Sequence, residues 1–138
     1  MQAVILAAGR GTRMGKLTET LPKPMLEVAG KSLLEHKFDA LPEEVHEIVL
    51  IVGYLKETII ERFGDSYKGK QITYIEQTNI VGGTMDALLQ AKPHLTEKFL
   101  VMMGDDIYAS ADISAVLAHD WALLVQRVSG TQYKKYFF

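Results

Sequence analysis

The 138-residue sequence contains no cysteine, which excludes disulfide bonds, thiolate zinc sites and cysteine nucleophiles together. It also has no excess of positive charge, because 15 Lys and Arg residues against 17 Asp and Glu residues give a formal net charge of −2. No global basic field therefore exists to attract nucleic acid or an anionic membrane, and any polyanion must be held by a local site. Hydrophobic residues make up 48% and charged residues 23%, the balance of an ordinary globular domain.

The N-terminal run MQAVILAAGRG lacks the pattern of a targeting segment. No basic residue precedes its apolar stretch, Gly-Arg-Gly follows in place of a cleavage site, and the stretch is too short to span a bilayer. We therefore expect a cytoplasmic location. The sequence also shows no internal repeat, linker or low-complexity segment, so we expect residues 1–138 to form a single domain.

Short apolar runs that end near glycine alternate with helical patterns. Strands are predicted over residues 3–8, 47–52, 71–75 and 99–103, with a fifth apolar strand over 121–128, and helices over 32–41, 55–63, 83–91 and 113–119. This alternation predicts a three-layer α/β/α sandwich with a mainly parallel sheet. Ligands bind such sheets beyond the carboxyl ends of the strands, so segments 9–13, 77–84 and 104–106 should meet at one edge.

The segment LAAGRGTRMGKLTETLPKPM, residues 6–25, combines glycines with cations. Gly9 and Gly11 allow backbone amides to approach an oxyanion closely, and the neighbouring Arg and Lys side chains supply positive charge. Two better-known phosphate loops are excluded: Gly9 and Gly11 are too close for G-x-x-x-x-G-K-[ST], and G-x-G-x-x-G fails at Met14. No acidic residue ends the second predicted strand, where a ribose-binding carboxylate would lie.

A simple turn with solvated cations is the alternative interpretation of such a loop. Lys23 argues against it, because Pro22 and Pro24 restrict the backbone on both sides and present this lysine on a stiff segment. A lysine that is only solvated does not require a restricted backbone on both sides. The pattern therefore favours phosphate binding.

Two carboxylates, Asp105 and Asp106, follow the apolar strand predicted over residues 99–103. Magnesium prefers oxygen ligands, commonly one or two carboxylates together with phosphate oxygens. Gly-Asp-Asp is also a common turn sequence, but its position at the same predicted edge as the glycine loop, residues 9–13, favours a metal site. Because successive side chains tend to point in different directions, we expect one of the two to ligate.

These motifs, in this order, resemble the sugar-1-phosphate nucleotidyltransferases, which include glucose-1-phosphate thymidylyl- and uridylyltransferases and mannose-1-phosphate guanylyltransferases. The resemblance runs from residue 3 to about residue 128 through the G-x-G-T-R loop, Pro-Lys-Pro, a Gln followed by Gly-Thr, and an apolar strand ending in Gly-Asp. It implies a Rossmann-like fold and a magnesium-dependent transfer of a nucleotidyl group from a nucleoside triphosphate to a sugar 1-phosphate. The products would be pyrophosphate and a nucleotide sugar.

The resemblance also assigns roles to single residues. Nucleotide binding would involve Leu6, Ala7, Ala8, Gly9, Gly11, Thr12, Arg13, Gln77, Gly83 and Thr84. Arg13 and Lys23 would be catalytic, by stabilising the charge that moves onto pyrophosphate, and Asp105 would bind the catalytic Mg²⁺. The chain departs from the family at Lys16, where many members have proline, and at Met85, where alanine is common, but neither change removes a group that the chemistry needs.

Members of this family usually have a longer catalytic domain, so the resemblance implies a truncation after about residue 128. The missing part normally carries most of the sugar pocket and a second metal-binding aspartate. A nucleotide-binding module or fragment that keeps the triphosphate site without full turnover is therefore the alternative function.

The base and the sugar stay open, although Pro-Lys-Pro-Met favours a pyrimidine nucleotide. We expect the aromatic tail YKKYFF to be covered by another chain, most simply in a homodimer through the C-terminal edge, or else disordered.

Overall fold

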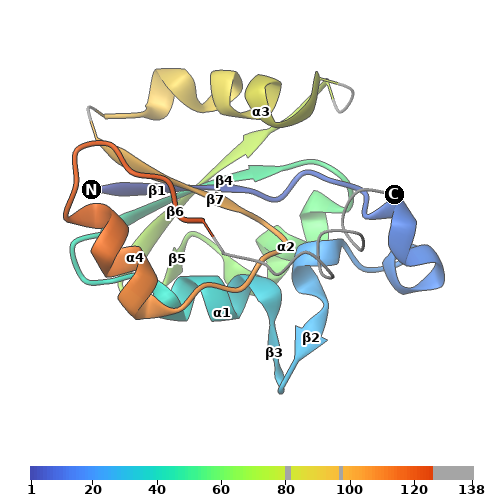
Figure 1. Cartoon of the computed structure of the whole chain (residues 1–138). Helices are drawn as coiled ribbons and strands as arrows, with labels where there is room; N and C mark the ends of the chain where they lie inside the picture. Colours follow the sequence, from blue (N-terminus) through green and yellow to red (C-terminus); the bar gives the residue numbers. More distant parts are fainter. Residues whose placement is uncertain (80–81, 97, 126–138) are drawn as a thin grey trace, which may run out of the picture.

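A five-stranded sheet lies at the centre of the computed structural model, which describes residues 1–79, 82–96 and 98–125 (Figure 1). The strand order is β5-β6-β4-β1-β7. Four strands run parallel: β1 (Gln2–Leu6), β4 (Glu47–Val52), β6 (Lys70–Glu76) and β7 (Phe99–Met103). The short β5 (Ser66–Tyr67) pairs antiparallel with β6. The mainly parallel sheet predicted from the apolar runs is confirmed.

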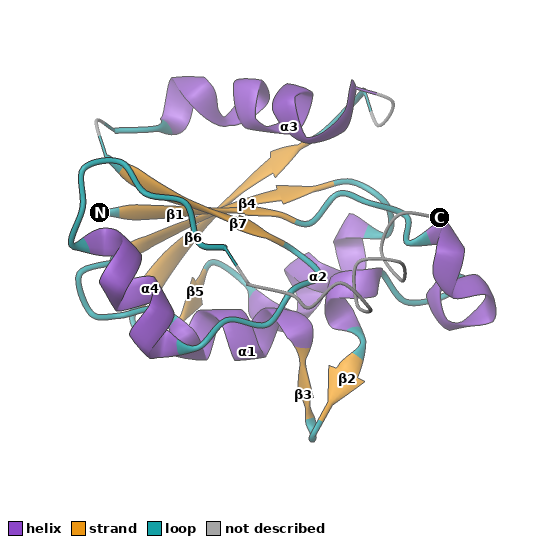
Figure 2. Ribbon diagram, in the orientation of Figure 1, coloured by secondary structure: helices purple, strands orange, loops and turns teal. Residues whose placement is uncertain are grey.

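Helices cover both faces of this sheet (Figure 2). Helix α3 (Gly83–Ala91) lies on one face, and α1 (Leu33–Ala40), α2 (Lys56–Phe63) and α4 (Ser110–Leu117) lie on the other. The central strands are apolar on both faces because each face is buried: Ala3 and Ile5 of β1 pack into the core beneath α1, whereas Val4 packs toward α3. The predicted three-layer sandwich is therefore present.

Helix α1 shows how local sequence sets an element. A capping box starts it, because the Glu35 backbone N–H donates to Ser32 Oγ at 3.1 Å and the Ser32 N–H donates to Glu35 Oε2 at 2.8 Å. The helix ends shortly before Pro42. Its buried face has the i, i+3, i+4 spacing of a core helix and consists of Leu33, Leu34, Lys37, Phe38 and Ala40.

Several elements differ from the sequence prediction. Two-residue strands are too short for a periodic pattern, so the hairpin of β2 (Glu27–Val28) and β3 (Lys31–Ser32) was missed together with β5. Helix α4 begins at Ser110, three residues before the predicted start. The fifth predicted strand is wrong over residues 121–125, which form no strand, because an apolar run becomes a strand only when a neighbouring strand pairs with it. Residues 126–128 of that prediction and the tail YKKYFF lie outside the described residues.

Within the described ranges, no helix has the length and apolar character needed to cross a bilayer.

Candidate functional site

The loops after β1, β6 and β7 meet at the carboxyl edge of the sheet. Leu6 pairs in register with Ile51 and Met103, and Ile51 pairs with Ile75 of β6, so the four parallel strands end at nearly the same level. The Gly104 N–H donates to the Leu6 carbonyl at 2.9 Å, and a Cβ at Gly104 would lie only 2.4 Å from that oxygen. Glycine at position 104 therefore permits the acidic turn, residues 104–106, to approach the glycine loop closely.

The glycine loop leaves β1 at Leu6 and becomes exposed at Gly9. Ala7 and Ala8 are buried, and the Ala7 N–H donates to the Ile51 carbonyl at 2.8 Å. A Cβ at Gly9 would have no atom within 4 Å, so a ligand can approach the backbone here.

Gly11 turns the chain into η1 (Thr12–Thr18) with a φ of 63°, a conformation that favours glycine. The Thr18 hydroxyl donates to the Gly11 carbonyl at 3.0 Å and holds this turn. A Cβ at Gly11 would lie 3.0 Å from Lys23 Cβ, so the glycine loop packs directly against the Pro-Lys-Pro segment. Thr12 and Arg13 belong to η1, but their side chains are outside the described part of the structure.

Lys23 and Asp105, two residues singled out in the sequence, contact each other. Lys23 begins η2 (Lys23–Met25), and its Nζ lies 2.5 Å from Asp105 Oδ2. Both side chains are partly exposed. Burial raises the pKa of Asp105, but the hydrogen bond and the charge of Lys23 outweigh it, so the pKa lies below the usual value. The carboxylate is therefore ionised at neutral pH and open to solvent, as a metal ligand must be.

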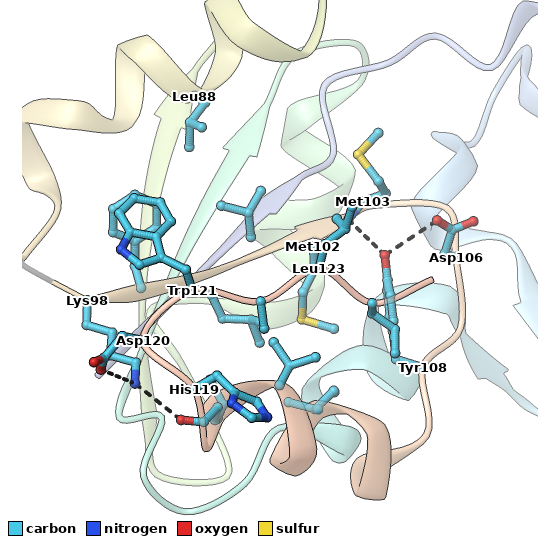
Figure 3. Close-up of a pocket in the computed structure, with 18 residues that line it drawn as sticks. Leu88, Lys98, Met102, Met103, Asp106, Tyr108, His119, Asp120, Trp121 and Leu123 are labelled. Atoms are coloured by element: carbon cyan, nitrogen blue, oxygen red, sulfur yellow. Dashed lines mark hydrogen bonds and ion pairs between the residues drawn. The ribbon is translucent and has the colours of Figure 1, made fainter. Parts of the chain in front are cut away.

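Asp106 points to a different partner, as expected for successive residues. The Tyr108 hydroxyl donates to Asp106 Oδ2 at 3.4 Å and accepts from the Met103 N–H at 3.2 Å (Figure 3). No cluster of three or more His, Asp or Glu side chains suited to a metal occurs among the described residues. A single carboxylate still fits Mg²⁺ when phosphate oxygens and water complete the shell, so Asp105 is the residue that could hold it.

Lys37, which no sequence motif singles out, lies fully buried under the acidic turn. Its Nζ donates to the backbone carbonyl of Asp106. Burial lowers the pKa of Lys37 to about 8, although the carboxylates of Asp106 and Asp105 raise it and Lys23 lowers it further. The sequence feature that could have identified Lys37 is its place among the apolar core positions of α1.

Gln77 lies directly after β6 and is buried at the base of the loop that leads to α3. Its Nε2 donates to the carbonyls of Asn79 at 3.1 Å and Gly83 at 3.2 Å. The hydrogen bond to Gly83 makes the predicted Gln and Gly-Thr elements adjacent, and Thr84 is exposed. Gln77 Nε2 also donates to Asp86 Oδ2 at 3.4 Å, so the hydrogen bonds of this amide to described residues are all made by its nitrogen.

Tyr54 was also missed, and it contacts both the glycine loop and the residue that follows η1. Its ring lies 5.0 Å from the Arg10 guanidinium carbon, and its hydroxyl donates to the Glu19 carbonyl at 2.8 Å. The Tyr54 N–H donates to the Ala8 carbonyl at 3.4 Å. An aromatic residue in the loop after a buried strand was the available signal.

A separate cavity of about 670 Å³ lies between β7, α4 and residues 119–124 (Figure 3). Its lining is mostly apolar, and Asp106 and Tyr108 stand at one end of it. Trp121 beside it is 95% exposed and Leu123 is 83% exposed. This cavity therefore adjoins the acidic turn without containing the Lys23–Asp105 pair.

This chain is similar to a known protein family and to several known proteins. Residues 2–123 match the family model described as nucleotidyl transferase. UTP–glucose-1-phosphate uridylyltransferase AglF of Haloferax volcanii is 42% identical over 143 residues, which cover 99% of this chain and 58% of that protein. The bifunctional protein GlmU of Methanococcus maripaludis is 40% identical over 132 residues, which cover 96% of this chain and 31% of that protein. The chain thus spans less than two thirds of either relative.

A solved structure supports the fold. The inositol-1-phosphate CTP transferase from T. maritima superimposes with a TM-score of 0.69 at 22% identity, over 83% of this chain and 47% of that one. The Rossmann-like arrangement expected from the sequence is confirmed by this likeness.

Proposed function

Because this chain belongs to the nucleotidyl transferase family, we propose that it transfers a nucleotidyl group from a nucleoside triphosphate to a sugar 1-phosphate. The observation that carries the proposal is the contact of Lys23 with Asp105 beside the glycine loop. A phosphate-binding cation, a carboxylate for a metal and an open backbone loop are the parts that this reaction requires. The 42% identity to a uridylyltransferase over nearly the whole chain supports the same reaction class.

The glycine loop would bind the triphosphate. Backbone N–H groups are accessible near Gly9, where no atom lies within 4 Å of the position that a Cβ would take. The rest of the nucleotide-binding surface would be formed by Leu6, Ala7, Ala8, Gly11 and Thr12. Arg13 would hold the phosphate chain. Lys23, mounted between two prolines, would reach the phosphates from the other side of the loop.

The reaction itself needs positioning and charge stabilisation more than a covalent protein nucleophile. A sugar-phosphate oxygen attacks the α-phosphorus, a new P–O bond forms, and the bond between the α-phosphorus and the bridging oxygen breaks to release pyrophosphate. Arg13 and Lys23 would stabilise the charge gained by the leaving group. Asp105 would hold Mg²⁺, which supplies further neutralisation of phosphate charge when bound.

The base would lie against Gln77, Gly83 and Thr84. Since Gln77 Nε2 donates to Asn79 and Gly83, the amide would present Oε1 to the base as an acceptor. That acceptor matches the N3–H donor of uracil or thymine. Guanine also has a ring N–H, so the proposal of a pyrimidine nucleotide draws further support from the uridylyltransferase relative.

A nucleotide-binding module without full turnover is the second candidate, because the chain spans only 58% and 31% of the two relatives. Pyrophosphate release, measured with four nucleoside triphosphates crossed with several sugar 1-phosphates, tests the first proposal. Release with UTP or dTTP and one sugar phosphate supports transferase activity. Calorimetric binding of UTP without release supports the module, and absence of both would refute the two candidates together.

The remaining proposals concern location and assembly. We propose a cytoplasmic protein that associates as a homodimer through the C-terminal edge. Strand β7 pairs only with β1 among the described strands, so its second edge is free there. The exposed apolar side chains of Trp121, Leu123 and Val125 lie in the segment that follows α4.

A further inference from the structure

Lys37 is a charged residue at a core position. It lies on the buried face of α1 between Leu34 and Phe38 and is among the largest fully buried side chains of the described residues. Burying an ammonium group is unfavourable unless its donors are satisfied. An apolar side chain of similar length would fill the same volume without that cost. Packing alone therefore gives no reason for lysine here.

Among the described residues, the polar contacts of the Lys37 ammonium are with Asp106 and Tyr108. Its Nζ donates to the Asp106 carbonyl and lies 5.9 Å from the centroid of the Tyr108 ring. The described residues offer it no other hydrogen-bond partner. The charges that act on the pKa of Lys37 are the carboxylates of Asp106 and Asp105 and the ammonium of Lys23.

The turn is held at three points. Gly104 donates to Leu6 on the side of the glycine loop, and the Tyr108 hydroxyl bridges Met103 and Asp106 on the side of the cavity (Figure 3). Lys37 supplies the third contact from the core. Losing it would leave the Asp106 carbonyl without this partner and would loosen the turn that also carries Asp105.

We propose that Lys37 is a positioning residue that holds the Asp106 carbonyl so that the Asp105 carboxylate faces Lys23 and the phosphate-binding loop. The inference rests on the proposed function, because it gives Asp105 the role of metal ligand. Groups that orient a ligand from behind typically change metal affinity by about 10- to 100-fold when removed.

The sign of the effect separates positioning from charge. A buried ammonium repels a cation at Asp105, so its removal would tighten metal binding if charge were its only contribution. Loss of positioning acts in the opposite direction and weakens metal binding. A variant that loses both the hydrogen bond and the charge of Lys37 therefore shows, by the direction in which metal affinity changes, which contribution is larger.

The test uses Lys37→Met in the full chain, with Mn²⁺ as the probe and electron paramagnetic resonance as the readout. In the presence of UTP, we expect Mn²⁺ affinity to fall about tenfold, while UTP binding in EDTA is unchanged. The thermal midpoint should stay equal or rise, because a buried charge is replaced by an apolar side chain. Lys92→Met, in the exposed turn η4 (Lys92–His94) that precedes β7, is the matched control and should behave as the parent.

A readout without ligand makes the test independent of the proposed function. Amide hydrogen exchange at Gly104 should become about tenfold faster in Lys37→Met, the size expected for loss of one hydrogen bond from a charged donor, while β4 stays protected. If Lys37→Met does not fold, Lys37→Leu, which also has no hydrogen-bond donor, must show the same changes. Unchanged or tighter Mn²⁺ binding, or unchanged exchange at Gly104, would overturn the proposal.

Failure of the parent chain to bind Mn²⁺ with UTP would instead refute the metal-dependent function. The exchange measurement would still decide whether Lys37 holds the turn.

Discussion

Lys23 Nζ lies 2.5 Å from Asp105 Oδ2, although 82 positions separate the two residues in the sequence. The contact forms because η2 and the end of β7 reach the same edge of the sheet. The lysine therefore occupies a carboxylate oxygen that the proposed metal ion would use. When a metal–triphosphate complex binds, Asp105 would contact the metal and Lys23 would contact phosphate. Each of the two charged groups would therefore exchange its present partner for a new one of opposite charge.

This exchange predicts opposite effects for Lys23→Met. Mn²⁺ binding without nucleotide should tighten, because the competing ammonium is gone. Pyrophosphate release should fall by about 10²- to 10³-fold, the usual cost of removing one group that stabilises transition-state charge. Lys31→Met, which breaks a comparable ion pair with Asp39 elsewhere on the surface, serves as the control. Weaker nucleotide-free Mn²⁺ binding in Lys23→Met would contradict the competition.

Arg13→Ala should weaken binding of UTP more than binding of uridine, because the arginine is proposed to hold the phosphate chain. A charged hydrogen bond contributes about 1.5–3 kcal/mol, which corresponds to a loss of roughly 10- to 150-fold for UTP. Calorimetry with the two ligands measures the difference. Arg62→Ala, which removes an exposed arginine paired with Glu35, should leave both affinities unchanged. Equal UTP binding by Arg13→Ala and the parent would refute the role.

The two neighbouring carboxylates should differ in their effect on metal dependence. Asp105→Asn should raise the Mg²⁺ concentration needed for half-maximal activity or nucleotide binding by at least about tenfold, because it removes the proposed ligand. Asp106→Asn should be milder, since that side chain only accepts a 3.4 Å hydrogen bond from Tyr108. A reversed order would assign the ligand to Asp106.

Asp39 should make stability depend on pH. Hydrogen bonds from Lys31 and Lys68 lower its pKa from 3.8 to about 2. A depressed carboxylate pKa stabilises the folded state above the unfolded value and loses that effect as pH falls toward 2. Because both lysines are half exposed or more, the contribution is about 1 kcal/mol at neutral pH. Urea unfolding of Asp39→Asn should therefore show this deficit equally at pH 7 and pH 5, and a smaller one at pH 3.

Asp120→Asn is the control for that comparison, since Asp120 lies 3.7 Å from Lys98 and is almost fully exposed. Its substitution should change the free energy of unfolding little at any of these pH values. A pH-independent deficit in Asp39→Asn would contradict the electrostatic origin.

The proposed homodimer should weaken when the exposed apolar segment after α4 becomes polar. Light scattering over a range of concentrations should give a dimer for the parent and a shift toward monomer for Trp121→Ser combined with Leu123→Ser. Val28→Ser, in the exposed hairpin of β2 and β3, should have no effect. A parent that stays monomeric at every concentration would refute the assembly.

The sequence by itself determined the elements that have a strong local signal. Strands 47–52 and 99–103 and helix 83–91 were predicted with their observed limits, because continuous apolar runs or helical spacing ended at glycine or proline. It also identified Lys23 and Asp105 as candidates, since a lysine between prolines and a carboxylate after a buried strand are visible in the residue order. Residues 121–125 show the limit of such signals, because they are apolar and yet form no strand.

Only the tertiary structure decided how these residues meet. The pairing of Lys23 with Asp105, the burial of Lys37 under the acidic turn and the orientation of the Gln77 amide each depend on how separate segments of the chain are placed. They are set by the strand order β6-β4-β1-β7, which places the loops after β1, β6 and β7 at one edge. Local periodicity specifies which face of each element is buried, but the strand order comes from packing all the elements into one core, because only that packing brings residues distant in sequence into contact.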